Sequence, residues 1–190
     1  SILTLGGAAL DAINAPNQYW QGLLVHGTFT AAGTAKTSFV RLGATPAAGN
    51  TTLTFASAVT GWQAGDTVVV PDSRHLRGDE NPGSLGGSYV SQTETRTLSS
   101  VAGNNLSAGV SALTYAHPAA VDSTSTTRYR PHVMNLTRNT VIRSAAPTGV
   151  RGHVLFTGEA KVTITNVEFR QLGRVRAGAE EVPDVGNGRP

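Results

Sequence analysis

The sequence predicts an all-β protein, and within that class a right-handed parallel β-helix, or β-solenoid, with long polar loops. Only 14% of the residues are charged and 22 are glycine, which disfavours a helical bundle because such bundles need charged and leucine residues at helical spacing. Short apolar runs recur between Gly, Asn, Pro and Asp, as in chains built of many short strands. An Ile-Thr-Asn-Val-Glu-Phe unit late in the chain suits the corner of a solenoid.

Nine strands are expected along the chain, separated by turn residues and polar loops. They are Ile2–Leu5, Gly22–Thr30, Ser38–Leu42, Thr51–Phe55, Thr67–Val70, Thr93–Ser100, Asn139–Arg143, His153–Thr157 and Lys161–Phe169. Tight turns are expected at Gly6-Gly7, Ala48-Gly49-Asn50, Ala64-Gly65-Asp66 and Gly103-Asn104-Asn105. Long loops are expected at Asp72–Tyr89 and Asp122–Thr127.

Many short strands fit either a solenoid or a sandwich or barrel of antiparallel hairpins. The C-terminal third favours the solenoid, because an asparagine at a corner tolerates left-handed backbone and inward aliphatic side chains can then stack from coil to coil. The corner is placed at Asn166, and the inward candidates are Val141, Val154, Val162, Ile164, Val167 and Phe169.

Composition limits the possible partners and cofactors. There is no cysteine, so disulfides and thiolate metal sites are excluded. The net charge of +3 is mildly basic, but the thirteen arginines are spread along the chain and form no nucleic-acid-binding run. No apolar stretch is long enough for a membrane span. The chain starts at Ser1 without a leader, so we expect a processed or excised piece of a longer protein.

Three blocks resemble a known extracellular family. GLLVHGTFTAAGTAKTSFVRL, WQAGDTVVVPDS and QTETRTLSSV are similar to the eight-glycine ("G-eight") domain, and PHVMNLTRNTVIRSA, RGHVLFTGEAKVTITNVEFRQLGR and GNGRP to the β-helix that follows it. This family includes fibrocystin, the cell-migration-inducing hyaluronan-binding protein and bacterial relatives. The similarity covers about residues 20–190, and its most specific parts are Trp62–Val70, Leu136–Arg143 and Gly152–Gly173.

The resemblance implies the C-terminal part of an eight-glycine-type domain at residues 1–60, and parallel β-helix at residues 61–190 that continues past the chain end. It also implies an extracellular or cell-surface location, and for the animal members hyaluronan binding or depolymerisation. The segment Arg74–Tyr89 is longer than in those relatives. A Pro-x-His-x-His block of the family would follow Pro190, so catalytic histidines are expected outside this chain.

Arginines are the best candidates for binding a polysaccharide. Arg138, Arg143, Arg151, Arg170 and Arg174 recur along the predicted C-terminal strands. Outward positions in stacked coils would form a basic ladder, and guanidinium groups pair well with the carboxylates of uronic-acid sugars. An ordinary solvated face is the alternative.

Candidate catalytic residues are His153 and Glu94, each with a structural alternative. His153 would otherwise be a turn histidine, and Glu94 the partner of an arginine. Asp66 is expected to serve the turn, and His117 has no carboxylate at ligand spacing. No motif indicates a cofactor or nucleotide, although stacked coils could assemble a divalent-cation site.

Three functions therefore stay open. The first is a polysaccharide-binding or polysaccharide-processing module, with hyaluronan or a similar uronate polymer as the ligand and hydrolase or lyase activity undecided. The second is a structural or adhesive solenoid without catalysis, which would stack on identical copies. The third is a fragment that assembles with the remainder of the same polypeptide.

Overall fold

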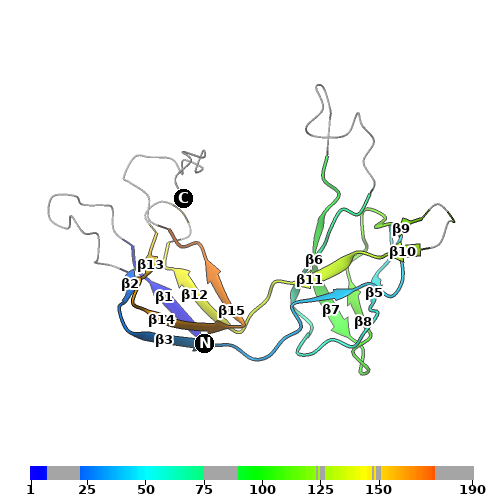
Figure 1. The fold of residues 1–190 in the computed structure, drawn as a ribbon. Helices are drawn as coiled ribbons and strands as arrows, with labels where there is room; N and C mark the ends of the chain where they lie inside the picture. Colours follow the sequence, from blue (N-terminus) through cyan, green and yellow to red (C-terminus); the bar gives the residue numbers. More distant parts are fainter. Residues whose placement is uncertain are drawn as a thin grey trace. The chain divides into compact units, whose positions relative to one another are not determined.

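A computed structural model describes residues 1–7, 22–74, 90–122, 124, 127–146, 148 and 151–173 (Figure 1). All regular structure in these residues is β-strand, which confirms the all-β prediction. Their contacts divide the chain into two units. Unit 1 consists of Ser1–Thr34 with Arg138–Pro190, and unit 2, Ala35–Thr137, is inserted between them in the sequence.

Unit 1 contains seven described strands. They are β1 (Ile2–Leu5), β2 (Gly22–Val25), β3 (Thr28–Ala32), β12 (Thr140–Ser144), β13 (His153–Phe156), β14 (Lys161–Thr165) and β15 (Val167–Arg170). Each of them was predicted as a strand or as part of one. The expected strand at Gly22–Thr30 is interrupted at His26 and Gly27, and the one at Lys161–Phe169 is interrupted at Asn166.

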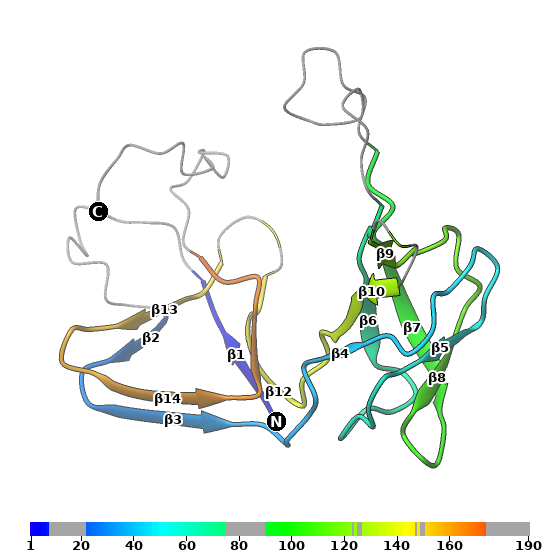
Figure 2. The same cartoon turned by 45° about the vertical axis from the view of Figure 1, so that its right-hand side comes forward.

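All strand pairs of unit 1 in the described residues are parallel. The sequence β1, β2, β3 is repeated by β12, β13, β14, and each strand of the second set pairs with its counterpart in the first. β15 then pairs with β12 and adds a third strand to the first sheet. The three sheets lie as three sides of a triangle around a common axis (Figure 2). We call each set of three strands a coil.

Apolar side chains are aligned along the inner face of the coils, where Ile142 is buried and Leu3 and Phe169 on either side of it are partly exposed. Leu3, Ile142 and Phe169 occupy equivalent positions on the three strands of the first sheet. On the other two sheets, the rings of Phe29 and Phe156 meet with their centroids 5.4 Å apart. This interior supports the predicted inward orientation of Phe169.

Val141 departs from that prediction. It is in register with Ile2 and Glu168, one residue out of step with Phe169. Because side chains alternate between the faces of a strand, Val141 lies on the opposite face from Ile142, although both are buried. Because Val141 and Ile142 are adjacent and both aliphatic, the sequence does not indicate which of them points inward.

The corner between β14 and β15 is a single residue, Asn166, with a φ of 53°. Asparagine is one of the few residues that adopt this left-handed backbone readily, so the predicted corner is confirmed. Gly33 stacks on this corner, since its N–H donates to the carbonyl of Thr165 (2.8 Å) and a Cβ at position 33 would collide with the carbonyl oxygen of Asn166.

A reciprocal pair of hydrogen bonds joins the two chain segments that leave and re-enter unit 1. The backbone N–H of Thr34 donates to Oδ1 of Asn139 (2.8 Å), and Nδ2 of Asn139 donates to Oγ1 of Thr34 (2.6 Å). Unit 1 is therefore held closed at the point where unit 2 is inserted.

Unit 2 contains eight described strands. They are β4 (Phe39–Arg41), β5 (Thr52–Thr54), β6 (Thr67–Val70), β7 (Glu94–Val101), β8 (Ser107–Val110), β9 (Ala120–Val121), β10 (Thr127–Tyr129) and β11 (His132–Asn135). Four of these were not predicted: β8, β9, β10 and β11. At three of the predicted turns, Gly49, Gly65 and Asn105 have a positive φ, of 83°, 89° and 58°.

Six strands of unit 2 form an antiparallel sheet in the order β4-β11-β6-β7-β8-β5. An antiparallel bridge between Leu42 and Phe55 joins its two outer strands, so the sheet closes on itself as a small barrel. Its interior is a continuous apolar cluster. Members of this cluster are Val40, Leu42, Leu53, Phe55, Val59, Trp62, Val68, Val70, Leu98, Ala108, Val110, Leu113 and Val133.

The prediction of parallel β-helix from residue 61 onward is wrong for residues 61–137, because the described strands of this stretch pair antiparallel. The division into units also falls at residues 34–35 and 137–138, whereas the sequence placed one boundary at 60–61. The sequence pattern showed alternating apolar residues and turn residues, and these occur both in parallel β-helices and in antiparallel barrels. The antiparallel barrel that the sequence left open is the arrangement of unit 2.

Asp66 does more than serve the predicted turn. Its carboxylate is fully buried and accepts hydrogen bonds from Nζ of Lys36 (2.7 and 2.8 Å), from Nδ2 of Asn135 (2.8 Å) and from the backbone of Gln63 (3.0 Å). Burial of a charge is tolerated when the charge is paired and hydrogen-bonded in this way. The turn before β6 is thereby tied to the start of unit 2 and to β11.

Candidate functional site

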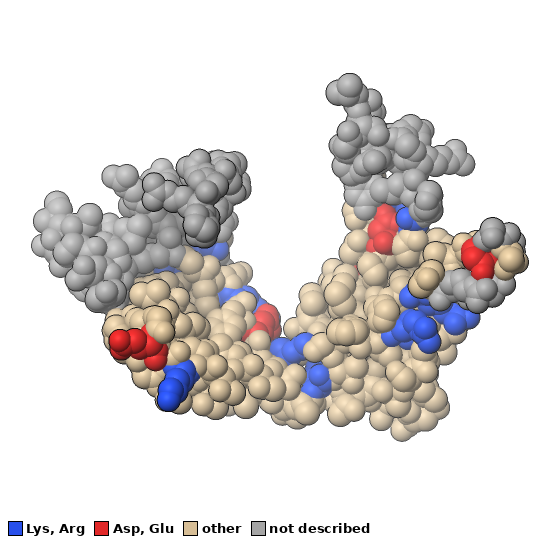
Figure 3. Space-filling view, viewed as in Figure 1, with Lys and Arg blue, Asp and Glu red and all other residues tan. Residues whose placement is uncertain are grey.

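Two of the predicted arginines lie side by side on the first sheet of unit 1. Arg143 on β12 is in register with Arg170 on β15, and Thr4 holds the equivalent position on β1. Both arginines are exposed, and neighbouring strands are about 4.8 Å apart. We call this pair the arginine column. Figure 3 shows basic side chains beside an acidic one over β12 and β15.

The arginine column follows a repeat that the sequence reasoning missed. Asn139-Thr-Val-Ile-Arg143 and Asn166-Val-Glu-Phe-Arg170 have the pattern Asn-x-x-x-Arg and start 27 positions apart. The paired register of β12 and β15 has the same offset. An alignment of the sequence with itself at this spacing would have revealed both the coil length and the paired arginines.

The electrostatics of the column leave room for an anion. Like charges on neighbouring strands repel, by on the order of 1 kcal/mol in water for a separation of about 5 Å. Glu168 offsets part of this charge, because its Oε1 accepts a hydrogen bond from Nε of Arg170 (2.7 Å). This hydrogen bond raises the pKa of Arg170. Among the described residues, the side chain of Arg143 makes a long contact to Oγ1 of Thr4 (3.5 Å).

The other predicted arginines do not join the column. Arg138 lies in the connection before β12, and Arg151 lies before β13. Both are half-buried and neither occupies a strand position in register with Arg143. Arg174 is outside the described residues. Of the four predicted arginines that the structure describes, two form the column, and Thr4 holds the equivalent position on the first strand.

His153 packs against the neighbouring coil. It is in register with Gly22 on β2, and its imidazole lies where a Cβ at position 22 would be. The absence of a side chain at Gly22 is what makes room for the ring. His153 is thus the first residue of β13 and packs on the adjacent strand, whereas the structural alternative in the sequence was a turn histidine.

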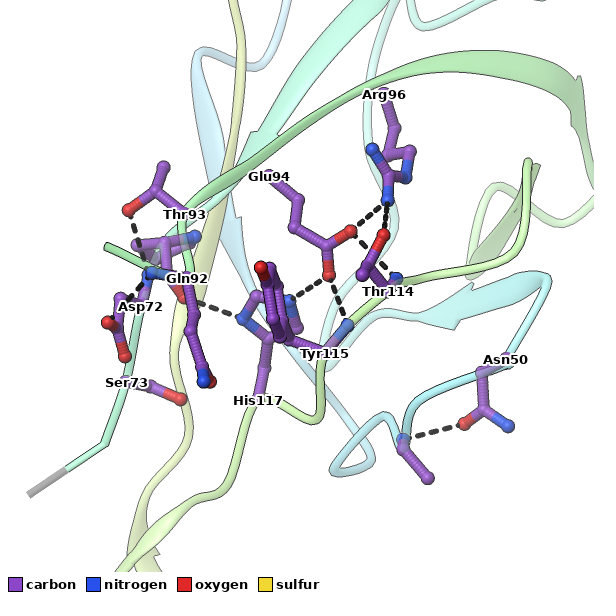
Figure 4. Close-up of polar contacts among 12 residues, drawn as sticks. Asn50, Asp72, Ser73, Gln92, Thr93, Glu94, Arg96, Thr114, Tyr115 and His117 are labelled. Atoms are coloured by element: carbon purple, nitrogen blue, oxygen red, sulfur yellow. Dashed lines mark hydrogen bonds and ion pairs between the residues drawn. The ribbon is translucent and has the colours of Figure 1, made fainter. Parts of the chain in front are cut away.

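Glu94 lies at the centre of a polar cluster in unit 2, at the start of β7 (Figure 4). Oε1 accepts from the backbone N–H of Tyr115 (2.9 Å) and contacts Nε2 of His117 (3.0 Å). Oε2 accepts from the backbone N–H of Thr114 (2.8 Å) and from the guanidinium of Arg96. Both oxygens are therefore occupied by donors within the protein.

These contacts determine the charge of Glu94. Burial would by itself raise the pKa of Glu94, but the hydrogen bonds from Thr114, Tyr115 and His117 and the charge of Arg96 lower it to about 2. A carboxylate held ionised by so many donors is a poor proton acceptor for catalysis. The geometry matches the structural alternative, in which Glu94 pairs with an arginine.

His117 is the residue of this cluster that the sequence did not connect to a carboxylate. Its ring is fully buried, with Nδ1 2.8 Å from the carbonyl oxygen of Pro71 and Nε2 3.0 Å from Glu94. Both partners are hydrogen-bond acceptors, so the ring is held between two oxygen atoms, one of Pro71 and one of Glu94. The two residues are 23 positions apart, and only the folding of β7 against the segment after β8 brings them together.

Asp72 and Arg74 form a second ion pair next to this cluster. Oδ2 of Asp72 accepts from the Arg74 guanidinium (2.8 Å) and from the backbone of Gln92 (3.0 Å). The hydrogen bond from Arg74 holds the pKa of Asp72 well below its usual range. Asp79 and Glu80, which also follow β6 in the sequence, are outside the described residues.

Within the described ranges, no group of three or more His, Asp or Glu side chains could hold a metal ion. The same residues contain no helix of the length and apolarity that would cross a membrane.

No family model matches the chain, and no curated protein matches it. The tailspike protein gp49 from Pseudomonas phage LKA1 is similar over 80% of this chain and 25% of its own length, with 18% identity and a TM-score of 0.36. The tailspike gp61 from Pseudomonas phage phi297 is similar over 78% of this chain and 24% of its own, with 15% identity and a TM-score of 0.36. This chain spans about a quarter of either tailspike. A likeness at this level assigns neither family nor activity.

Proposed function

We propose that unit 1 belongs to a right-handed parallel β-helix and binds an extended anionic polysaccharide through the arginine column. The repeated order of parallel strands supports the β-helix, since parallel crossover connections are right-handed in nearly all proteins. The observation that carries the binding proposal is the in-register, exposed pair Arg143 and Arg170. Guanidinium forks pair with carboxylates in two parallel hydrogen bonds, which suits a uronate polymer.

Hyaluronan is one member of this class of ligand, and an extracellular or cell-surface location belongs to the same proposal. No catalytic role is proposed for Glu94 or His153, because the first is saturated by donors and the second packs on Gly22. In this proposal unit 1 is a scaffold that holds arginines at equivalent positions of successive coils.

Titration of the protein with oligosaccharides by calorimetry tests this function. Wild type and the double variant R143A/R170A are compared on a hyaluronan octasaccharide, an oligogalacturonate and a neutral dextran oligosaccharide. Loss of charge-assisted hydrogen bonds, each contributing about 1.5–3 kcal/mol, is expected to weaken binding of the acidic sugars by at least tenfold. Lys161→Ala removes an exposed basic residue of β14 away from the column and is the matched control.

Binding of the acidic sugars should weaken with added salt, because exposed charge pairs are screened. Equal affinity of wild type and R143A/R170A would contradict the role of the column. Equal affinity for dextran and the uronates would contradict the anionic class of ligand.

A structural solenoid is the second candidate, and the open coil ends favour it. Val162 and Ile164 of β14 are in register with Phe29 and Ala31, yet 40% and 37% of their surfaces are exposed. Neither β13 nor β14 has a partner on its second edge among the described strands. Unpaired edges with aligned apolar side chains can stack on another coil.

Sedimentation velocity distinguishes this candidate. Stacking of identical copies predicts concentration-dependent assemblies that Val162→Lys abolishes, because a charge would then enter the stacked interior. A protein that stays monomeric at all accessible concentrations would exclude self-stacking, and the polysaccharide test is unaffected by this outcome.

A further inference from the structure

The outer surface of β4 and β11 in unit 2 carries exposed apolar and basic side chains. Val40 and Val133 are buried inside the barrel, so their strand neighbours point outward. The outward residues are Phe39, Arg41, His132, Met134 and, directly after β11, Leu136. We call these five residues the β4–β11 face.

This face combines an apolar centre with basic groups. Phe39 is 61% exposed and lies opposite Met134, while Arg41 lies opposite His132. The rings of Phe39 and His132 meet edge to face with centroids 5.6 Å apart. No Asp or Glu is present in β4, β6 or β11, so no carboxylate from these strands neutralises the face.

The arginine of this face differs from other arginines of unit 2. Arg74 and Arg96 each form an ion pair with a carboxylate of unit 2. Among the described residues no such ion pair involves Arg41, so its charge is available to an anion.

We infer that the β4–β11 face is a second binding site for a carboxylate-bearing sugar, an inference that rests on the proposed function of unit 1. The exposed Phe39 ring would pack against the apolar face of a sugar ring, and Arg41 would bind its carboxylate. The charge of Arg41 and the exposed ring of Phe39 on the same strand favour this occupant, because guanidinium groups pair with carboxylates and aromatic rings pack on apolar surfaces.

The experiment compares single variants of unit 2 on the same hyaluronan octasaccharide and oligogalacturonate. Phe39→Ala and Arg41→Ala are each expected to weaken binding by about tenfold, measured by calorimetry in the background of R143A/R170A, so that unit 1 does not mask the site. Tyr129→Ala is the matched control, since Tyr129 is an exposed aromatic residue on β10 outside the face. Chemical shifts of the Met134 methyl group report contact at the face independently of affinity.

The two proposals fail in different ways. If R143A/R170A weakens binding in an otherwise wild-type chain and F39A and R41A change nothing, the inference about unit 2 is overturned and the proposed function stands. If F39A and R41A weaken binding but R143A/R170A does not, the arginine column is overturned. If F39A instead changes the sedimentation of the free protein without changing sugar binding, the face is a protein interface and the inference is wrong.

Discussion

Replacing Glu94 by glutamine should destabilise unit 2 strongly. Glutamine keeps the shape of glutamate, but its amide group must face either Thr114 and Arg96 or Tyr115 and His117, which are donors themselves. The variant also leaves the guanidinium of Arg96 without its anion. Removing one partner of a buried ion pair typically costs about 3–5 kcal/mol.

The pKa of Glu94 gives an independent magnitude. It falls from an ordinary value of 4.5 to about 2 on folding, and each pKa unit corresponds to about 1.4 kcal/mol, so the ionised carboxylate contributes on the order of 3 kcal/mol. Because the pKa is lower in the folded state, this contribution is complete above about pH 4.5. It is lost as the pH falls toward 2, where the folded protein also takes up the proton.

Urea denaturation followed by tryptophan fluorescence measures both effects. A Trp20→Phe background leaves Trp62, in the core of unit 2, as the only tryptophan. Glu94→Gln is expected to lower the free energy of unfolding at pH 7 by about 3–5 kcal/mol. The difference in unfolding free energy between wild type and variant should shrink between pH 4.5 and 2.

Glu159→Gln is the control, because Glu159 is exposed in the turn before β14 and should change neither quantity. A Glu94→Gln protein as stable as wild type at pH 7, with the same acid profile, would refute the assigned role of the carboxylate.

Three further predictions concern the corners and the buried charge. Asn166→Ala should destabilise unit 1 by about 1 kcal/mol, and Asn166→Gly should cost less, because only alanine is strained at a φ of 53°. Chemical denaturation of both variants separates the backbone strain from the loss of the asparagine side chain. Gly33→Ala should cost about 1–3 kcal/mol, since its Cβ would overlap the Asn166 carbonyl, and Gly158→Ala, which has open space around it, should be tolerated in the same assay. Lys36→Met should cost about 3–5 kcal/mol by leaving Asp66 buried without a cation, and a melting temperature equal to that of wild type would contradict this.

Local signals in the sequence were sufficient for the strands of unit 1 and for one of its corners. Asn166 was identifiable because asparagine between two apolar pairs has few alternatives to a left-handed turn. The face of β12 was not identifiable, since Val141 and Ile142 are both buried. The pairing of Arg143 with Arg170 was encoded as a repeat, but its single recurrence is easily overlooked.

Unit 2 was harder to predict because its organisation depends on contacts between distant residues. The strands β8 and β11 contain small or polar residues, and the alternation of buried and exposed positions extends over only four residues in each. Nothing local distinguishes a strand of an antiparallel barrel from one of a parallel coil. The association of Glu94 with His117 likewise arises from the fold and from no spacing in the sequence.

The insertion of unit 2 has a consequence for the order in which the protein folds. β1, β2 and β3 are made first, but their partners lie beyond the inserted segment, and Ile2 pairs with a residue 139 positions later. Long-range parallel pairing of this kind is slow because the loop must close before the contacts form. A barrel that folds early during synthesis would turn a flexible connection of 103 residues into a compact body between Thr34 and Arg138. The hydrogen bonds between Thr34 and Asn139 then close the step in which the chain returns to β1, β2 and β3.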